Sequence, residues 1–242
     1  MNRIKLTICA LGLMSSAVAF QSCSDDDNDD LAIWQPTALV TVRPASDGSF
    51  TMQLNDTATL HPSNMSDSPF GNKEVRALVS YTDNGYSGGK HSVFINWIDS
   101  IRTKMPVPSL GANNSSAYGD SPIEIVNDWV TVAEDGYLTL RIRTLWGNTN
   151  RPHYINLISG TNTANPYEFE LRHNANGDFG NNLGDALIAF NLNKINLVDT
   201  NRDIKIKINW NSFSGYKSAE FDLKLRPLSE SPEPVPYSRY VK

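Results

Sequence analysis

The chain has 242 residues, of which 40% are hydrophobic and 19% are charged, and its formal net charge is −5. This composition is typical of a globular protein and excludes a disordered or fibrous chain. An acidic chain without a basic tract is poorly suited to bind phosphate backbones, because non-specific affinity for nucleic acids comes mainly from Lys and Arg. We therefore expect no nucleic-acid partner.

Residues 1–22 have the organisation of a secretory signal peptide. Arg3 and Lys5 precede the apolar run 6–20, which is too short and wrongly flanked for a stable membrane-spanning helix. Cys23 follows directly after a small residue, and this arrangement resembles a bacterial lipobox of the looser Bacteroides type. An ordinary signal peptide would instead leave Cys23 as the lone free thiol of an exported protein. We predict that Cys23 is lipidated, for example with palmitate, and anchors the protein to the outer membrane.

A short acidic tether follows the predicted anchor within residues 23–30. Its acidic residues are Asp25, Asp26, Asp27, Asp29 and Asp30. Such a run of like charges cannot form a core, so we interpret it as a solvated spacer between the bilayer and the folded part. In this position it also resembles the acidic export signal of Bacteroides-type surface lipoproteins. The sequence therefore predicts display on the cell surface, with a periplasm-facing orientation as the alternative.

Residues 31–108 are predicted to form a small β-barrel. The stretches 37–43 and 49–54 alternate apolar and polar residues around a turn that contains glycine, which is typical of a β-hairpin. The stretches 74–81 and 91–98 repeat this pattern. Four or five such strands in about 75 residues match the size of a small barrel.

Residues 122–227 are predicted to form an antiparallel β-sandwich. Short apolar runs recur between turns, at residues 123–132, 137–144, 153–158, 167–172, 186–192, 204–210 and 219–225. The stretch 106–122 is rich in Pro, Gly, Asn and Ser, and residues 109–121 within it are predicted to be a linker. Residues 229–236 are acidic and Pro-rich, and residues 228–242 are predicted to be an extended tail. The expected fold class is all-β, with a small barrel followed by a sandwich.

The His-Glu-x-x-His, phosphate-loop and paired-Cys patterns, which would indicate metal binding or catalysis, are absent from the sequence. Ser87 lies in a Gly-rich turn between two predicted strands, not at the start of a helix, so its Ser-x-x-Lys match with Lys90 is attributed to chance. The histidines are predicted to be structural residues of sheets or turns; they are His61, His91, His153 and His173. The segment 174–185 has oxygen ligands at some positions of a calcium loop, but its glycine is at position four instead of six, so a plain turn is favoured. We therefore expect no enzyme activity, no catalytic residue, no metal and no cofactor.

Aromatic residues give the sequence its candidate ligand platform. Trp129 lies in an apolar run and is predicted to be in the core. Trp146, Tyr154 and Trp210 lie near predicted strand ends or loops, where exposed rings could stack on a sugar or contact a partner. Short Asp-Ser/Thr-aliphatic patterns also make Thr57 and Ser100 candidate sites of O-glycosylation.

Several segments together resemble the NigD-like lipoprotein family. They include the acidic leader, the strand at 37–43 and the runs DWVTVAEDGYLTLRIRT and RPHYINLISG. The most specific pieces are residues 153–157 (HYINL) and 171–174 (LRHN). The resemblance covers residues 23–227 and implies an N-terminal OB-like barrel followed by a C-terminal β-sandwich. It implies at most a loose link to bacteriocin production or immunity.

Two functions follow from these observations. The first is a non-catalytic, surface-exposed outer-membrane lipoprotein that acts as an interaction module for an unknown protein, associated with bacteriocin production or immunity. The alternative is a cell-surface lipoprotein that binds a glycan, which requires Trp146, Tyr154 and Trp210 to be exposed together. The sequence identifies neither the partner nor the glycan.

Overall fold

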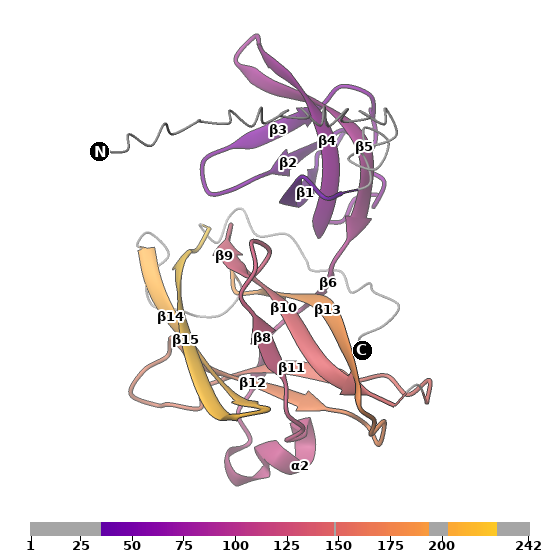
Figure 1. The fold of residues 1–242 in the computed structure, drawn as a ribbon. Helices are drawn as coiled ribbons and strands as arrows, with labels where there is room; N and C mark the ends of the chain where they lie inside the picture. The colour runs from indigo at the N-terminus through magenta and orange to yellow at the C-terminus, as the bar shows by residue number, and fades with distance from the viewer. Residues whose placement is uncertain (1–34, 148, 194–202, 227–242) are drawn as a thin grey trace, which may run out of the picture.

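The computed structural model of the chain describes residues 35–147, 149–193 and 203–226, which form a barrel and a sandwich (Figure 1). The predicted signal peptide, the anchor Cys23, the acidic tether and the tail 228–242 lie outside the described residues. Within these ranges, no helix is long and apolar enough to cross a membrane.

The N-terminal unit is a closed barrel of five strands. Around the barrel the order is β1 (Ala38–Pro44), β2 (Phe50–Gln53), β3 (Thr59–Pro62), β5 (Lys90–Ser100) and β4 (Val75–Ser87), and β4 pairs with β1 to close it. Alternate residues of β1, among them Val40 and Val42, point into the barrel and pack against Met52, Leu60 and Val93. This confirms the small barrel predicted from the alternating pattern.

The C-terminal unit is a sandwich of two sheets. One sheet has the order β6 (Arg102–Lys104), β13 (Asn182–Asn191), β10 (Tyr137–Trp146) and β8 (Glu124–Val126), with β9 (Val132–Glu134) also paired to β10. The other has the order β15 (Gly215–Lys224), β14 (Asp203–Ser212), β12 (Glu168–Asn174), β11 (Tyr154–Ser159) and β7 (Val107–Pro108). Antiparallel pairs dominate, although β6–β13, β7–β11 and β12–β14 pair in parallel.

The sandwich core comes from residues that alternate along the central strands. Leu138, Leu140 and Ile142 of β10 are buried, as are Phe169 and Leu171 of β12. Each such side chain contributes about 1.5–3 kcal/mol when it leaves water, so these positions hold the two sheets together.

The prediction that Trp129 lies in the core is wrong. Its side chain is 53% exposed. The run predicted as one strand is interrupted after β8, where the Asp128 carboxylate accepts the backbone N–H of Trp129. The Thr131 N–H also donates to the Asp128 carbonyl at 2.9 Å. A β-turn over residues 128–131 therefore replaces the strand at this point, and aspartate is favoured at the first position of such a turn.

The boundary between the two units differs from the predicted linker. β6 and β7 fall within the predicted barrel segment 31–108, yet they pair with β13 and β11 of the sandwich. Residues 109–121 are not a free linker, because they include the 3₁₀ turn η1 (Gly111–Asn113) and the helix α2 (Asn114–Tyr118), which lies against β11 and β12. Edge strands of two or three residues have no detectable periodicity, so only the tertiary pairing reveals them.

The barrel docks on the sandwich through an apolar contact. Leu39 of β1 and Leu78 of β4 point away from the barrel core and pack with Ile101, Leu187 and Ala189. Consequently β1 is buried on both faces along most of its length. This explains why its sequence is more continuously apolar than that of a strand with one solvated face.

Buried charges surround this apolar contact. Arg76 of β4 is fully buried, and its guanidinium lies 3.2 Å from Glu134 of β9. The same guanidinium donates hydrogen bonds to the hydroxyls of Thr41 at 3.1 Å and Thr139 at 3.3 Å. Burial raises the pKa of Glu134, although the charge of Arg76 opposes that shift. The contact therefore depends on Arg76 being paired.

A second group of buried charges joins the start of β4 to the end of β15. Arg226 donates two hydrogen bonds to the Glu74 carboxylate, at 2.9 and 2.7 Å, and lies 3.0 Å from Asp135. Tyr137 also donates to Glu74, and Arg43 pairs with Asp135. Asp135 reaches this position from the tight turn between β9 and β10. The barrel and the sandwich are therefore connected by both apolar and ionic contacts.

Candidate functional site

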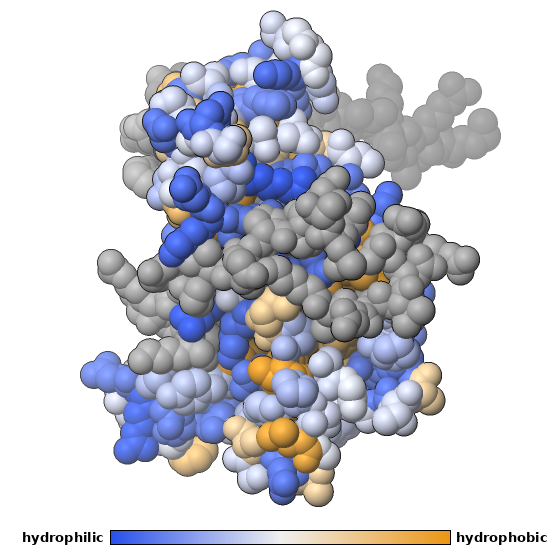
Figure 2. All heavy atoms as spheres, turned by 180° about the vertical axis from the view of Figure 1, so that it is seen from behind, coloured by the Kyte–Doolittle hydropathy of each residue, from blue (hydrophilic) through white to orange (hydrophobic). Residues whose placement is uncertain are grey.

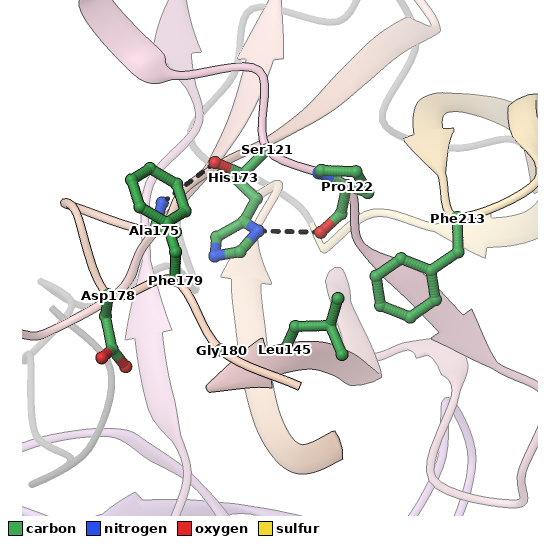
Figure 3. Close-up of a pocket in the computed structure, with 9 residues that line it drawn as sticks. All are labelled: Ser121, Pro122, Leu145, His173, Ala175, Asp178, Phe179, Gly180 and Phe213. Carbon is green, nitrogen blue, oxygen red and sulfur yellow. Dashed lines mark hydrogen bonds between the residues drawn. The ribbon is translucent and has the colours of Figure 1, made fainter. Parts of the chain in front are cut away.

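The candidate site is a pocket at one end of the sandwich, between the loop that joins β12 to β13 and the segment before β8. Its volume is about 110 Å³, and it is lined by Ser121, Pro122, Leu145, His173, Ala175, Asp178, Phe179, Gly180 and Phe213. Figure 3 shows Phe179 and Phe213 on opposite sides of the pocket, with the ring of His173 between them. Phe179 is 80% exposed and Phe213 is 40% exposed.

Two close backbone approaches hold the loop that carries Phe179. A Cβ at Gly180 would lie 2.2 Å from the carbonyl oxygen of Trp146, and a Cβ at Gly147 would lie 2.7 Å from the carbonyl oxygen of Phe179. Only glycine leaves room for this contact. The loop before it turns at Asn176 and Gly177, both with positive φ. The pocket wall is therefore tightly packed, although Phe179 itself is exposed.

Asp178 is buried at the base of this loop and accepts hydrogen bonds from the segment that follows β10. Its carboxylate accepts the backbone N–H of Gly147 at 3.0 Å, and it accepts the backbone N–H and hydroxyl of Thr149 at 3.1 and 2.6 Å. These hydrogen bonds, the Thr149 hydroxyl foremost, lower the pKa of Asp178 to about 2. Asp178 is therefore ionised at neutral pH and already engaged.

These contacts also explain why the segment 174–185 does not have the geometry of a calcium loop. Asp178 points toward Thr149, whereas Asp185 pairs with Arg141 and Arg143 on the face of the sheet. In the part of the chain that the structure describes, no group of three or more His, Cys, Asp or Glu side chains is placed to hold a metal ion.

Two histidines connect Asp178 to the opposite wall of the pocket. His153 Nε2 lies 3.2 Å from the Asp178 carboxylate, and His153 Nδ1 lies 2.8 Å from His173 Nε2. His173 Nδ1 lies 3.0 Å from the carbonyl oxygen of Pro122. Both rings are buried, and burial lowers the pKa of His173 to about 4. Burial also lowers the pKa of His153, although Asp178 opposes that shift.

The predicted ligand platform of Trp146, Tyr154 and Trp210 is wrong as a shared exposed surface. Trp210 is 5% exposed and belongs to the sandwich core. Trp146 stacks on His153, with ring centroids 3.9 Å apart, and its indole lies against Gly184. The alternation IKIKINW in β14 places Trp210 on the same face as Ile204, Ile206 and Ile208, and this pattern could have identified it as a core residue.

The residues that form the pocket and its surroundings were not predicted from the sequence as one site. His153 and His173 each looked like an isolated structural histidine, and only the pairing of β11 with β12 brings the two rings together. A signal existed, because both lie in the segments that most specifically resemble the NigD-like family. Phe179 precedes Gly180, and Phe213 lies two positions before Gly215. Neither local sequence indicates a shared pocket.

Comparison with protein families matches nearly the whole described part of the chain. The NigD-like N-terminal OB domain matches residues 39–101, and the NigD-like C-terminal beta sandwich domain matches residues 105–223. Comparison with curated proteins finds no match.

Solved structures give the same result. The chain is 32% identical to a candidate toxin-related protein from Parabacteroides distasonis, with a TM-score of 0.64, over 77% of this chain and 92% of that one. A NigD-like immunity protein from Bacteroides caccae is 22% identical, with a TM-score of 0.54, over 76% and 90% of the two chains. A candidate lipoprotein from Bacteroides fragilis is 12% identical, with a TM-score of 0.53, over 78% and 97%. The last two share the fold, whereas the domain matches over residues 39–101 and 105–223 show that the chain belongs to the NigD-like family.

Proposed function

We propose that this protein is a non-catalytic, lipid-anchored surface lipoprotein that binds a partner protein in a bacteriocin-related immunity system. Membership of the NigD-like family supports the link to bacteriocins, as does the fold shared with a protein named as a NigD-like immunity protein. The fold shared with a candidate lipoprotein supports the anchor. The observation that carries the binding role is the apolar pocket between Phe179 and Phe213.

The pocket has the properties of a site for one apolar side chain. Large aromatic side chains that remain exposed beside a pocket are typical of protein–protein contact sites. A volume of about 110 Å³ is close to that of a small ring or a branched aliphatic side chain. The ionised Asp178 and both nitrogens of His173 already have hydrogen-bond partners, so the lining offers no free charge to the occupant. We infer that the partner inserts an uncharged apolar residue between the two phenylalanines.

The surface around the sandwich is consistent with this assignment. Figure 2 shows a mainly hydrophilic barrel on the visible face, whereas the larger hydrophobic patches lie on the sandwich. The glycan alternative has less support, because Trp210 is in the core and the face of Trp146 is covered by His153. A protein partner is therefore the function that the geometry supports best.

Substituting both phenylalanines tests this proposal. The double variant Phe179→Ser/Phe213→Ser removes the aromatic walls, and we expect the affinity for the partner to fall by about 30-fold, which corresponds to the loss of an interface hot spot of about 2 kcal/mol. The measurement is capture of the partner from an outer-membrane fraction by the tagged protein, followed by titration of the purified pair. In a strain that lacks the wild-type gene, the same variant should fail to restore resistance to the cognate bacteriocin.

The matched control is Tyr86→Ser. Tyr86 is 76% exposed, so it is as accessible as Phe179, but it lies on the β4–β5 hairpin of the barrel. Capture that is equal for the double variant and the wild type would contradict the proposed site. Capture that is lost in the control alone would move the site to the barrel.

The predicted anchor is tested separately by Cys23→Ala. Without the thiol no acyl chain can be attached, and each buried CH₂ group of such a chain contributes about 0.8 kcal/mol of membrane affinity. We expect the variant to move from the membrane fraction to the soluble fraction after cell fractionation. Replacing Asp25, Asp26 and Asp27 with Asn should leave the anchor intact and reduce cleavage by protease added to intact cells. Retention of Cys23→Ala in the membrane would contradict lipidation at this residue.

A further inference from the structure

A chain of three hydrogen bonds runs behind the pocket, from the Pro122 carbonyl through His173 and His153 to the Asp178 carboxylate, over distances of 3.0, 2.8 and 3.2 Å. Pro122 and Asp178 lie on separate segments that both line the pocket. We propose that the pair of His153 and His173 is an acid-sensitive latch, which joins the two walls of the pocket and releases them when the pair takes up its second proton. This inference rests on the proposed function, in which the pocket holds the partner.

The number of protons on the rings decides how many of these bonds can form. Both ends of the chain only accept hydrogen bonds, because one is a carbonyl oxygen and the other is an ionised carboxylate. Three bonds between such ends need three ring N–H groups, whereas two neutral imidazoles supply two. One extra proton therefore completes the chain and places an imidazolium at His153, directly against the negative charge of Asp178. In this state the ring–ring bond uses His153 Nδ1–H as the donor and His173 Nε2 as the acceptor.

A second proton breaks the chain at its centre. With both rings charged, the two nitrogens that lie 2.8 Å apart both carry hydrogens, so neither can accept. Two positive charges also repel each other at this distance inside a poorly solvated site. The pKa of His173, lowered to about 4 by burial and by the charge of His153, agrees with this cost. Opening the pocket walls hydrates the rings, so acid favours the open state by proton linkage.

The neighbours of the two rings, apart from Asp178, place no unpaired charge against them. Trp146, which stacks on His153 from β10, is uncharged. Arg172, next to His173 on β12, is directed to the opposite face of the sheet and pairs with Glu170 at 2.8 Å and Asp120 at 3.2 Å. Arg151 lies nearby and donates to the carbonyl of Asn176 at 3.5 Å. Asp178 is therefore the anionic side chain in hydrogen-bond contact with the pair.

The test combines two measurements on the full mature chain between about pH 7.5 and 3.5. Nitrogen-15 NMR of the imidazoles follows protonation, with His61 and His91 of the barrel as internal references. Hydrogen exchange, corrected for the intrinsic effect of pH, follows opening of residues 175–180. We expect the shared ring–ring signal to be lost near pH 4, because burial lowers the pKa of His173 to about 4. Exchange of residues 175–180 should accelerate by about tenfold, the effect of losing one hydrogen bond. Exchange in β1 and β2 should not follow this midpoint.

His173→Gln serves as the non-titrating variant, and it should remove the acid-dependent step in exchange of residues 175–180. An exchange profile of these residues that parallels the barrel in the wild type, or a step that persists in His173→Gln, would overturn the latch. If the variant fails to fold, the wild-type titration still decides between the two outcomes. Partner binding at about pH 7 is measured separately. If binding persists in the variant that lacks Phe179 and Phe213, the proposed function fails. If the wild type binds its partner normally but shows no acid-dependent step in hydrogen exchange, only the latch is contradicted.

Discussion

Replacing Glu74 with alanine is expected to lower the free energy of unfolding by about 3–5 kcal/mol, the range for removing one partner from a buried ion pair. The Glu74 side chain is 1% exposed and accepts two hydrogen bonds from Arg226 and one from Tyr137. Its removal leaves the Arg226 guanidinium buried with only part of its partners. Denaturant unfolding at neutral pH measures the loss.

The same substitution should weaken the coupling between the barrel and the sandwich. Glu74 precedes the barrel strand β4, whereas Arg226 follows the last strand of the sandwich, β15. We therefore expect calorimetry of Glu74→Ala to resolve a barrel transition that is separate from the sandwich transition.

The matched control removes a carboxylate from an exposed ion pair. Asp222 lies 3.0 Å from Lys205, but the two side chains are 82% and 57% exposed. Asp222→Ala should therefore cost less than about 1 kcal/mol. Equal losses for the two variants would mean that the buried pair does not stabilise the contact between the units.

Acidification is expected to destabilise the folded protein by about 3 kcal/mol between pH 6.5 and 4 through His173 alone, because a pKa shift of one unit corresponds to about 1.4 kcal/mol. The unfolded chain takes up a proton on this histidine near its ordinary pKa of 6.5, whereas the folded protein resists protonation until about 4. This contribution to stability is complete above pH 6.5, decreases as the pH falls to 4, and does not change further below. Asp178, with its pKa lowered to about 2, extends the loss to lower pH.

The pH profile of His173→Gln distinguishes this contribution from general acid denaturation. The variant starts from a lower stability at neutral pH because it loses hydrogen bonds that His173 makes. Its free energy of unfolding should nevertheless change less between pH 6.5 and 4. Tyr154→Phe, which changes the neighbour of His153 at the start of β11, leaves both histidines in place and should retain the wild-type slope. An unchanged slope in His173→Gln would contradict the assigned role of this ring.

Local patterns were sufficient to predict the two β units. A strand with one buried face shows its alternation within six to ten residues, as in the run of β10 that contains Leu138, Leu140 and Ile142. The same logic applied to β14 would have placed Trp210 in the core. Trp210 was predicted to be a surface residue because it lies near a strand end, although the alternation of β14 continues through it.

The pairing of distant residues could not be predicted in the same way. Arg226 and Glu74 are 152 positions apart, and nothing near either residue indicates the other. The short strands β6 and β7 likewise gain their structure from parallel partners in the sandwich. A tertiary contact of this kind is selected by the docking of the two units, so it has no local signal in the chain.

By itself, the sequence determined that this is an all-β protein with a barrel before a sandwich, because side-chain periodicity depends only on neighbouring residues. It also predicted the anchor at Cys23 and the acidic tether from their order along the chain. Only the tertiary structure decided that His153, His173 and Asp178 form one hydrogen-bonded chain, and that Phe179 and Phe213 enclose a pocket beside it. These groups come from different strands and loops, and their chemistry depends on distances that arise only when the sheets pair and pack.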